Sequence, residues 1–177
     1  PADSTTVMAG GEALVAAKGG EAVYAQTDAD GNVIFAGDDA LRISDTVSCQ
    51  LILVGDNTLI SDTRIGLNCR NLTIDGSGTL SISAPADYGL HATGSMCIKD
   101  GKITAESAEG TLLLSTLFQM EGGYLSSTAT AEGSCGLEFA ASVLSGGTLI
   151  GRGDSMGVST LRSGPEVQIG PGVHVYA

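Results

Sequence analysis

Residues 72–107 read LTIDGSGTLSISAPADYGLHATGSMCIKDGKITAES, and this stretch decides the fold. Apolar residues alternate in it with Thr, Ser and Lys, and glycine-containing turns interrupt the alternation. A period of two is typical of β-strands, whereas an amphipathic helix places apolar residues at i, i+3, i+4 and i+7. Because glycine also disfavours helices, the stretch predicts short strands joined by turns.

The same unit recurs on both sides of this stretch. Each copy contains an apolar strand, a glycine-containing turn and a second short strand, followed by a polar turn. The six copies are residues 51–60, 72–83, 96–107, 118–129, 143–153 and 167–177. A fixed repeat of this length indicates a protein built from stacked structural units.

Aligning the copies brings apolar residues into three columns, each with a period of about 21–25 residues. Three columns of one shared period predict three short strands per coil, stacked at the strand spacing of ~4.8 Å. Phe35 and Ile43 lie about one period before the second and third columns and predict a further, imperfect coil near residue 30. The columns are Leu53, Ile74, Ile98, Met120, Leu144 and Ile169; Leu59, Leu80, Ile103, Leu125 and Leu149; and Leu67, Leu90, Leu112, Leu137 and Val158.

We therefore predict an all-β fold: a right-handed parallel β-helix, or β-solenoid, of about six to seven coils with three short strands each. The right hand follows from the preference of parallel crossover connections. The 26 glycines and the aromatic content of 4% fit narrow coils with glycine at the corners. A Greek-key sandwich is the alternative, although it does not explain three columns of one period.

We divide the chain into an N-terminal segment, residues 1–44, and the parallel β-helix, residues 45–177. The segment predicts an irregular cap with a hairpin around DADGN at 28–32. We expect the cap to cover the N-terminal end of the coils, because an open end is an exposed strand edge. The chain starts without Met and ends on the strand-like VHVYA, so we expect further domains in a longer protein.

Charge and hydropathy exclude two classes of partner. The chain carries 20 acidic and 8 basic residues, with a net charge of −12. Such a surface repels a phosphate backbone, so we predict no nucleic-acid binding. No apolar run approaches the ~20 residues of a membrane-spanning helix, and we predict no membrane insertion.

No catalytic set is recognisable in the sequence. Polysaccharide hydrolases need clustered acids, and solenoid lyases need a basic residue beside calcium-holding acids. The arginines are scattered, and the only two histidines, His91 and His174, lie several coils apart. We therefore predict that the protein is not an enzyme.

Acidic residues recur in the turn between the second and third strand of each coil. Stacking would bring these carboxylates close together, where like charges repel by a few tenths of a kcal/mol each. Either they are solvated corners of an acidic surface, or they form a row of ligands for calcium, which prefers oxygen donors. The five acids are Asp62, Asp87, Glu109, Glu132 and Asp154.

Residues 51–107 resemble secreted bacterial carbohydrate-binding β-helix proteins. The similarity lies in LILVGDNTLISD at 51–62 and in the whole stretch 72–107, which contains the family's GSGTL segment. This family is similar in shape to pectate lyases but is noncatalytic. The resemblance implies a secreted or bacterial cell-surface protein that binds plant-derived or acidic polysaccharide with calcium.

The best match to the family's Asp-Gly-Ile turn lies at residues 87–91. Asp87 matches its acid, Tyr88 is inserted, and His91 takes the basic or polar position that follows. The Lys-Asp-Asp that comes next in the family is replaced by ATGS at 92–95.

We predict carbohydrate binding by Asp87, Tyr88 and His91, beside the acid row. Because the chain has no Trp, a single soluble polysaccharide chain suits this corner better than a flat crystalline surface. The function predicted first is a noncatalytic extracellular polysaccharide-binding module of a bacterial cell-surface protein. A structural or adhesive stalk without a glycan ligand is the alternative, and a polysaccharide lyase is the least favoured.

Overall fold

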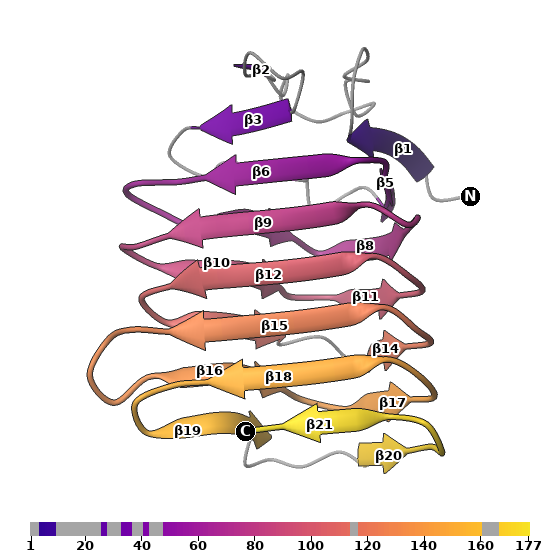
Figure 1. Ribbon diagram of the computed structural model, residues 1–177, viewed down its shortest axis with the longest axis vertical. Helices are drawn as coiled ribbons and strands as arrows, with labels where there is room; N and C mark the ends of the chain where they lie inside the picture. Colours follow the sequence, from indigo (N-terminus) through magenta and orange to yellow (C-terminus); the bar gives the residue numbers. More distant parts are fainter. Residues whose placement is uncertain are drawn as a thin grey trace.

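The structure is a computed structural model that describes residues 4–9, 26–27, 33–36, 41–42, 48–113, 117–160 and 167–177. These residues form three sheets whose strands stack along one axis, and they contain no helix (Figure 1). They accordingly include no helix long and apolar enough to cross a membrane. The predicted all-β parallel solenoid is confirmed.

Successive strands contribute in turn to the three sheets. Sheet A contains β1 (Ser4–Ala9), β5 (Ser48–Leu53), β8 (Asn71–Asp75), β11 (Ser95–Ile98), β14 (Leu117–Met120), β17 (Ser142–Leu144) and β20 (Val167–Ile169). Sheet B contains β2 (Gln26–Thr27), β3 (Val33–Ala36), β6 (Asp56–Ile60), β9 (Thr79–Ala84), β12 (Lys102–Ser107), β15 (Tyr124–Ala129), β18 (Thr148–Arg152) and β21 (His174–Tyr176). Sheet C contains β4 (Leu41–Arg42), β7 (Leu67–Cys69), β10 (Tyr88–Ala92), β13 (Gly110–Leu113), β16 (Cys135–Phe139) and β19 (Met156–Thr160).

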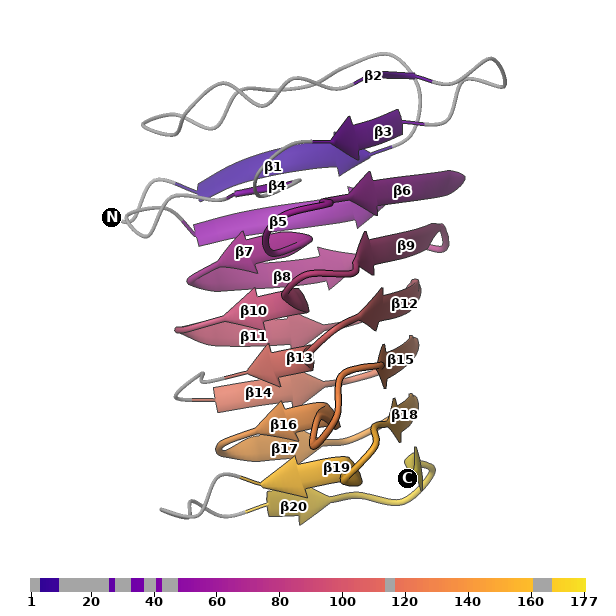
Figure 2. The same cartoon turned by 90° about the vertical axis from the view of Figure 1, so that its left-hand side faces the viewer.

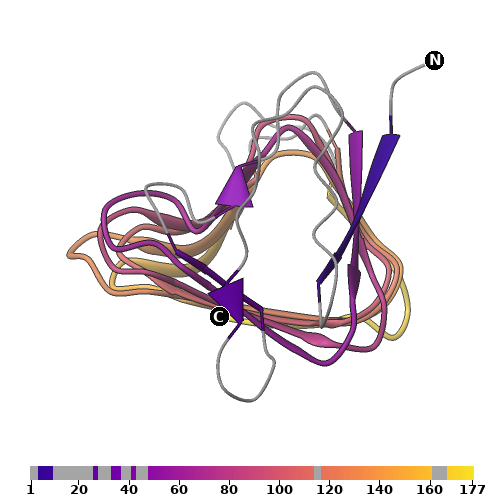
Figure 3. The ribbon, with the colours of Figure 1, turned by 90° about the horizontal axis from the view of Figure 1, so that it is seen from above.

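Five regular coils run from β5 to β19, each with one strand in sheet A, one in sheet B and one in sheet C. Strands β1, β3 and β4 pair with the first of these coils, and β20 and β21 pair with the last. Figure 2 shows sheets A and C with their strands stacked as rungs. Seen from the N-terminal end, the chain turns clockwise as it moves away from the viewer, so the solenoid is right-handed (Figure 3).

The inward-facing column of sheet A largely follows the prediction. Ile74, Ile98 and Met120 are in register, and Leu144 and Ile169 continue the column. Its first member was wrong, because Leu51 rather than Leu53 lies opposite Ile74. Positions two residues apart point to the same face of a strand, so alternation alone does not distinguish them.

The columns of sheets B and C each contain one wrong assignment. In sheet B the buried Asn57 lies opposite Leu80, and Leu59 pairs instead with Ile82. In sheet C, Thr111 rather than Leu112 continues the column of Leu90, because a register irregularity shifts the pairing between Tyr88 and Leu90. A one-residue shift exchanges the two faces of a strand, so Leu112 pairs in the outward-facing column instead.

The described parts of residues 1–44 contain strands that correspond to the predicted hairpin and to the predicted additional coil. Strands β2 and β3 pair antiparallel, as expected for a hairpin around residues 28–32. Phe35 lies opposite Leu59, one coil later, as the period predicts. Leu41, two residues before the expected Ile43, lies opposite Leu67. The rest of the predicted cap lies outside the described residues, and the domain boundary stays a prediction.

Removing the Thr111 hydroxyl is expected to stabilise the protein. This hydroxyl is buried in the solenoid interior without a hydrogen-bond partner. An unpaired buried polar group costs about 1–3 kcal/mol, so Thr111→Val should raise the free energy of unfolding by about 1 kcal/mol in urea titrations.

The matched control is Ser107→Ala, which removes a buried hydroxyl that has partners. The Ser107 hydroxyl accepts a hydrogen bond from Gly110 N at 3.0 Å and donates one to Gly110 O at 3.1 Å. Its loss should lower the free energy of unfolding by about 1–3 kcal/mol. A stabilising Ser107→Ala or a destabilising Thr111→Val would contradict this account of the interior.

The C-terminal end of the described solenoid exposes residues that continue buried columns. Ile169 is 59% exposed, whereas its neighbour Leu144 in the preceding coil is 1% exposed. Val175 is likewise 40% exposed beside Leu149, which is fully buried. Among the described strands, β20 and β21 therefore pair on one side only.

Candidate functional site

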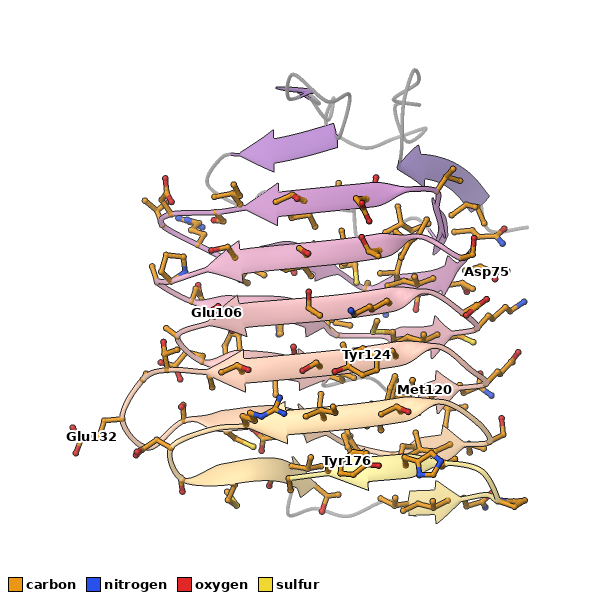
Figure 4. All side chains as sticks on the ribbon, viewed as in Figure 1. Asp75, Glu106, Met120, Tyr124, Glu132 and Tyr176 are labelled. Carbon is orange, nitrogen blue, oxygen red and sulfur yellow. The ribbon has the colours of Figure 1, made fainter. Side chains whose placement is uncertain are left out.

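The structure places the five predicted metal ligands in the turns that lead from sheet B to sheet C. Asp87 is half-buried, whereas the other four side chains are exposed, and Glu132 extends from the edge of the molecule in Figure 4. The turns follow β6, β9, β12, β15 and β18 and hold Asp62, Asp87, Glu109, Glu132 and Asp154, respectively.

Two of these acids use a carboxylate oxygen to bind the backbone. Asp87 Oδ1 accepts a hydrogen bond from Tyr88 N at 2.8 Å, and Asp154 Oδ2 accepts one from Gly133 N at 2.9 Å. Across the described ranges, no three His, Cys, Asp or Glu side chains are grouped so that they could hold a metal ion. Calcium takes six to eight oxygen ligands, so carboxylates of this row would need carbonyl or water oxygens to complete a site.

Melting curves test whether the acid row holds calcium. A metal that binds only the folded state raises the melting temperature. If the row holds calcium, as predicted from the sequence, the melting temperature should be higher in millimolar calcium chloride than in excess chelator, and the Asp87→Asn and Glu109→Gln double variant should lose this rise. The same melting temperature in calcium and in chelator would show that these carboxylates are solvated surface groups.

Tyr88 and His91 form a stacked pair on β10. Their ring centroids lie 5.8 Å apart, and the ring planes are inclined by 22°. Residues three apart on a regular strand point to opposite faces, so the pair depends on the register irregularity between Tyr88 and Leu90. Gly89 permits this irregularity, because a Cβ there would lie 2.9 Å from Ala105 Cβ.

Acidic and amide groups surround the stacked pair. Burial raises the pKa of the Tyr88 hydroxyl, and the negative charges of Glu109, Glu138 and Asp87 raise it further. His91 Nδ1 lies 3.4 Å from Asn68 Oδ1. The corner therefore presents two rings beside several oxygen acceptors.

Sequence reasoning brought together Asp87, Tyr88 and His91, and the structure confirms that they are neighbours at one corner. It missed Asn68 and Glu138. Both belong to the outward-facing column of sheet C that contains His91. An alignment with Leu112 in the outward-facing column would have identified Asn68 and Glu138 as neighbours of His91. The sequence analysis instead assigned Leu112 to the interior, which shifted the register of this column by one residue.

The thiols of Cys97 and Cys135 do not add reactive groups to this corner. Cys97 and Cys135 are half-buried. Burial is the main cause that raises the pKa of both thiols. A raised pKa disfavours the thiolate, which is the nucleophilic form of cysteine.

The arrangement at this corner is suited to binding hydroxyl-bearing molecules. Aromatic rings pack against the apolar faces of a ligand, and carboxylate and amide oxygens accept hydrogen bonds from its hydroxyls. In comparisons with known proteins, no family model, no curated protein and no solved structure matches the chain.

Proposed function

We propose that this chain is a noncatalytic extracellular polysaccharide-binding module of a bacterial cell-surface protein. The observation that carries the proposal is the stacked Tyr88 and His91 pair beside Asp87 and Asn68. A polysaccharide offers apolar ring faces for stacking and hydroxyls for hydrogen bonding, and both kinds of partner lie together at this corner.

The rigid scaffold supports binding by this corner. Tyr88 and His91 belong to β10, whose neighbours β7 and β13 are hydrogen-bonded to it on both sides. Little side-chain or loop ordering is then needed when a ligand binds, which reduces the entropic cost of association. The ligand class is a single soluble chain, either neutral or acidic.

Isothermal titration calorimetry with polygalacturonate tests this proposal. The Tyr88→Ala and His91→Ala double variant should bind at least about tenfold more weakly, a loss of ~1.4 kcal/mol. The matched control is Tyr176→Ala, because Tyr176 stacks on His174 in a similar pair on a different sheet, with centroids 6.4 Å apart. That variant should bind as the wild type does.

A stalk that only spaces or displays other domains is the second candidate. The observation in its favour is the continuous stack of coils, which is a form typical of elongated structural proteins. Failure of the wild-type chain to bind any neutral or acidic glycan would favour the stalk. Release of unsaturated sugar from pectin would instead favour a lyase.

A further inference from the structure

Small hydroxyl side chains line the outer face of sheet B. Pairing between neighbouring strands brings Thr58, Ser81, Thr104 and Ser126 into one column across β6, β9, β12 and β15. The residues on both sides of each, such as Leu80 and Ile82 beside Ser81, point inward and are buried. The column therefore faces outward, on the side of the molecule that Figure 4 presents to the viewer.

This face is hollowed into a trough of about 350 Å³. It extends across four consecutive strands, so its long direction follows the solenoid axis. Larger outward side chains stand on the same sheet, including Tyr124 and the trough-lining Glu106, both labelled in Figure 4. The hydroxyl-bearing lining residues are Thr58, Ser81, Ser83, Thr104, Ser126 and Thr128.

Ser126 is the least exposed hydroxyl-bearing residue of the trough lining. It lines the trough yet is only 9% exposed, which is unusual for an outward position. Its neighbour Thr104 donates a hydrogen bond to Ser81 Oγ at 3.4 Å, whereas the Ser126 hydroxyl has no partner among the described residues. A hydroxyl that is not engaged with another protein group can both donate a hydrogen bond to a ligand hydroxyl and accept one from it.

We propose that this trough is a second binding site, which takes a neutral polysaccharide extended along the solenoid axis. An extended hexose chain advances per sugar by a distance close to the strand spacing, ~4.8 Å, so each coil would meet one sugar. Serine and threonine hydroxyls both donate and accept hydrogen bonds, as sugar hydroxyls do. The trough thus offers one matching group per coil over four coils.

The negative charge of the protein at the trough favours neutral polysaccharides over acidic ones. Glu106 is the charged residue of the trough lining, and its carboxylate accepts hydrogen bonds from sugar hydroxyls but repels carboxylated sugars. The net charge of −12 on the whole chain acts in the same direction. This site stands apart from the corner at Tyr88, and the proposal does not depend on binding there.

Calorimetric titration with neutral hexasaccharides (cellohexaose, xylohexaose and mannohexaose), with hexagalacturonate as the acidic comparator, tests the trough. We expect the wild type to bind at least one neutral hexasaccharide and to bind hexagalacturonate more weakly. The Thr104→Val and Ser126→Ala double variant removes two hydroxyls and nearly preserves the shape. It should bind the neutral ligand about tenfold more weakly, and unchanged circular dichroism would show that it is folded.

Two controls separate the trough from other surfaces. Thr73→Val removes a hydroxyl from sheet A, where Thr73 pairs with Cys97, and should leave binding unchanged. The Tyr88→Ala and His91→Ala double variant should retain neutral hexasaccharide binding. Loss of binding in that variant, with wild-type affinity in the trough variant, would overturn the trough and support the corner. Absence of wild-type binding to every neutral hexasaccharide would also overturn the trough.

Discussion

Replacing Phe118 by alanine is expected to lower the free energy of unfolding by about 3–5 kcal/mol. Phe118 is fully buried, and its ring centroid lies 6.0 Å from that of Phe139 on β16 of the same coil. Truncation removes this contact and leaves a cavity that the hydrogen-bonded coils on either side cannot readily close. The loss is measured by urea titration followed by circular dichroism.

The control for Phe118 is Ile150→Ala on the outer face of sheet B. Ile150 is half-buried, so its truncation removes fewer contacts and opens no enclosed cavity. This variant should lower the free energy of unfolding by only about 1 kcal/mol. Equal losses for the two variants would show that the interior around Phe118 repacks freely, contrary to the rigid stacking described above.

Gly110→Ala is expected to destabilise the chain by about 3 kcal/mol or more, or to prevent folding. Gly110 has a φ of +87°, in the left-handed region that costs other residues about 1–2 kcal/mol. An added Cβ would also overlap the backbone oxygen of Cys135 in the next coil. The backbone of two coils would have to separate to admit one methyl group.

Gly133→Ala separates the conformational cost of a positive φ from the steric cost of the close approach between coils. Gly133 has a similar φ of +76°, but nothing lies within 4 Å of its added Cβ. Its alanine variant should lose only the conformational part, about 1–2 kcal/mol, in the same titration. A similar loss in both variants would show that the close approach of the coils at Gly110 is not limiting.

The fold could be predicted because its two signals are local and periodic. Alternation identifies strands, and one shared repeat length specifies three strands per coil. Exact register was harder, as Leu53 and Leu59 show, because neighbouring inward positions on a strand are equivalent in pattern. The turn lengths that choose between them depend on corner geometry, which the sequence does not display.

The sequence analysis predicted the corner at Tyr88 but not the trough on sheet B. Asp87, Tyr88 and His91 are close in sequence, so their proximity was accessible without a structure. The trough on sheet B was missed because its hydroxyls were interpreted only as the polar half of an alternating strand. A signal was present, since Thr58, Ser81, Thr104 and Ser126 recur at equivalent outward positions. The low exposure of Ser126, however, can be recognised only in the three-dimensional structure.

Strands β20 and β21 have a paired neighbour on one side only among the described strands, and this affects the order in which coils unfold. In a linear array each coil is held only by its nearest neighbours, so a coil with one neighbour opens at a lower free energy than a coil with two. Ile169 and Val175 lose less burial on opening than their counterparts in earlier coils. In the 177-residue chain, β20 and β21 are therefore expected to open at a lower free energy than β11 and β12, which have a paired strand on both sides.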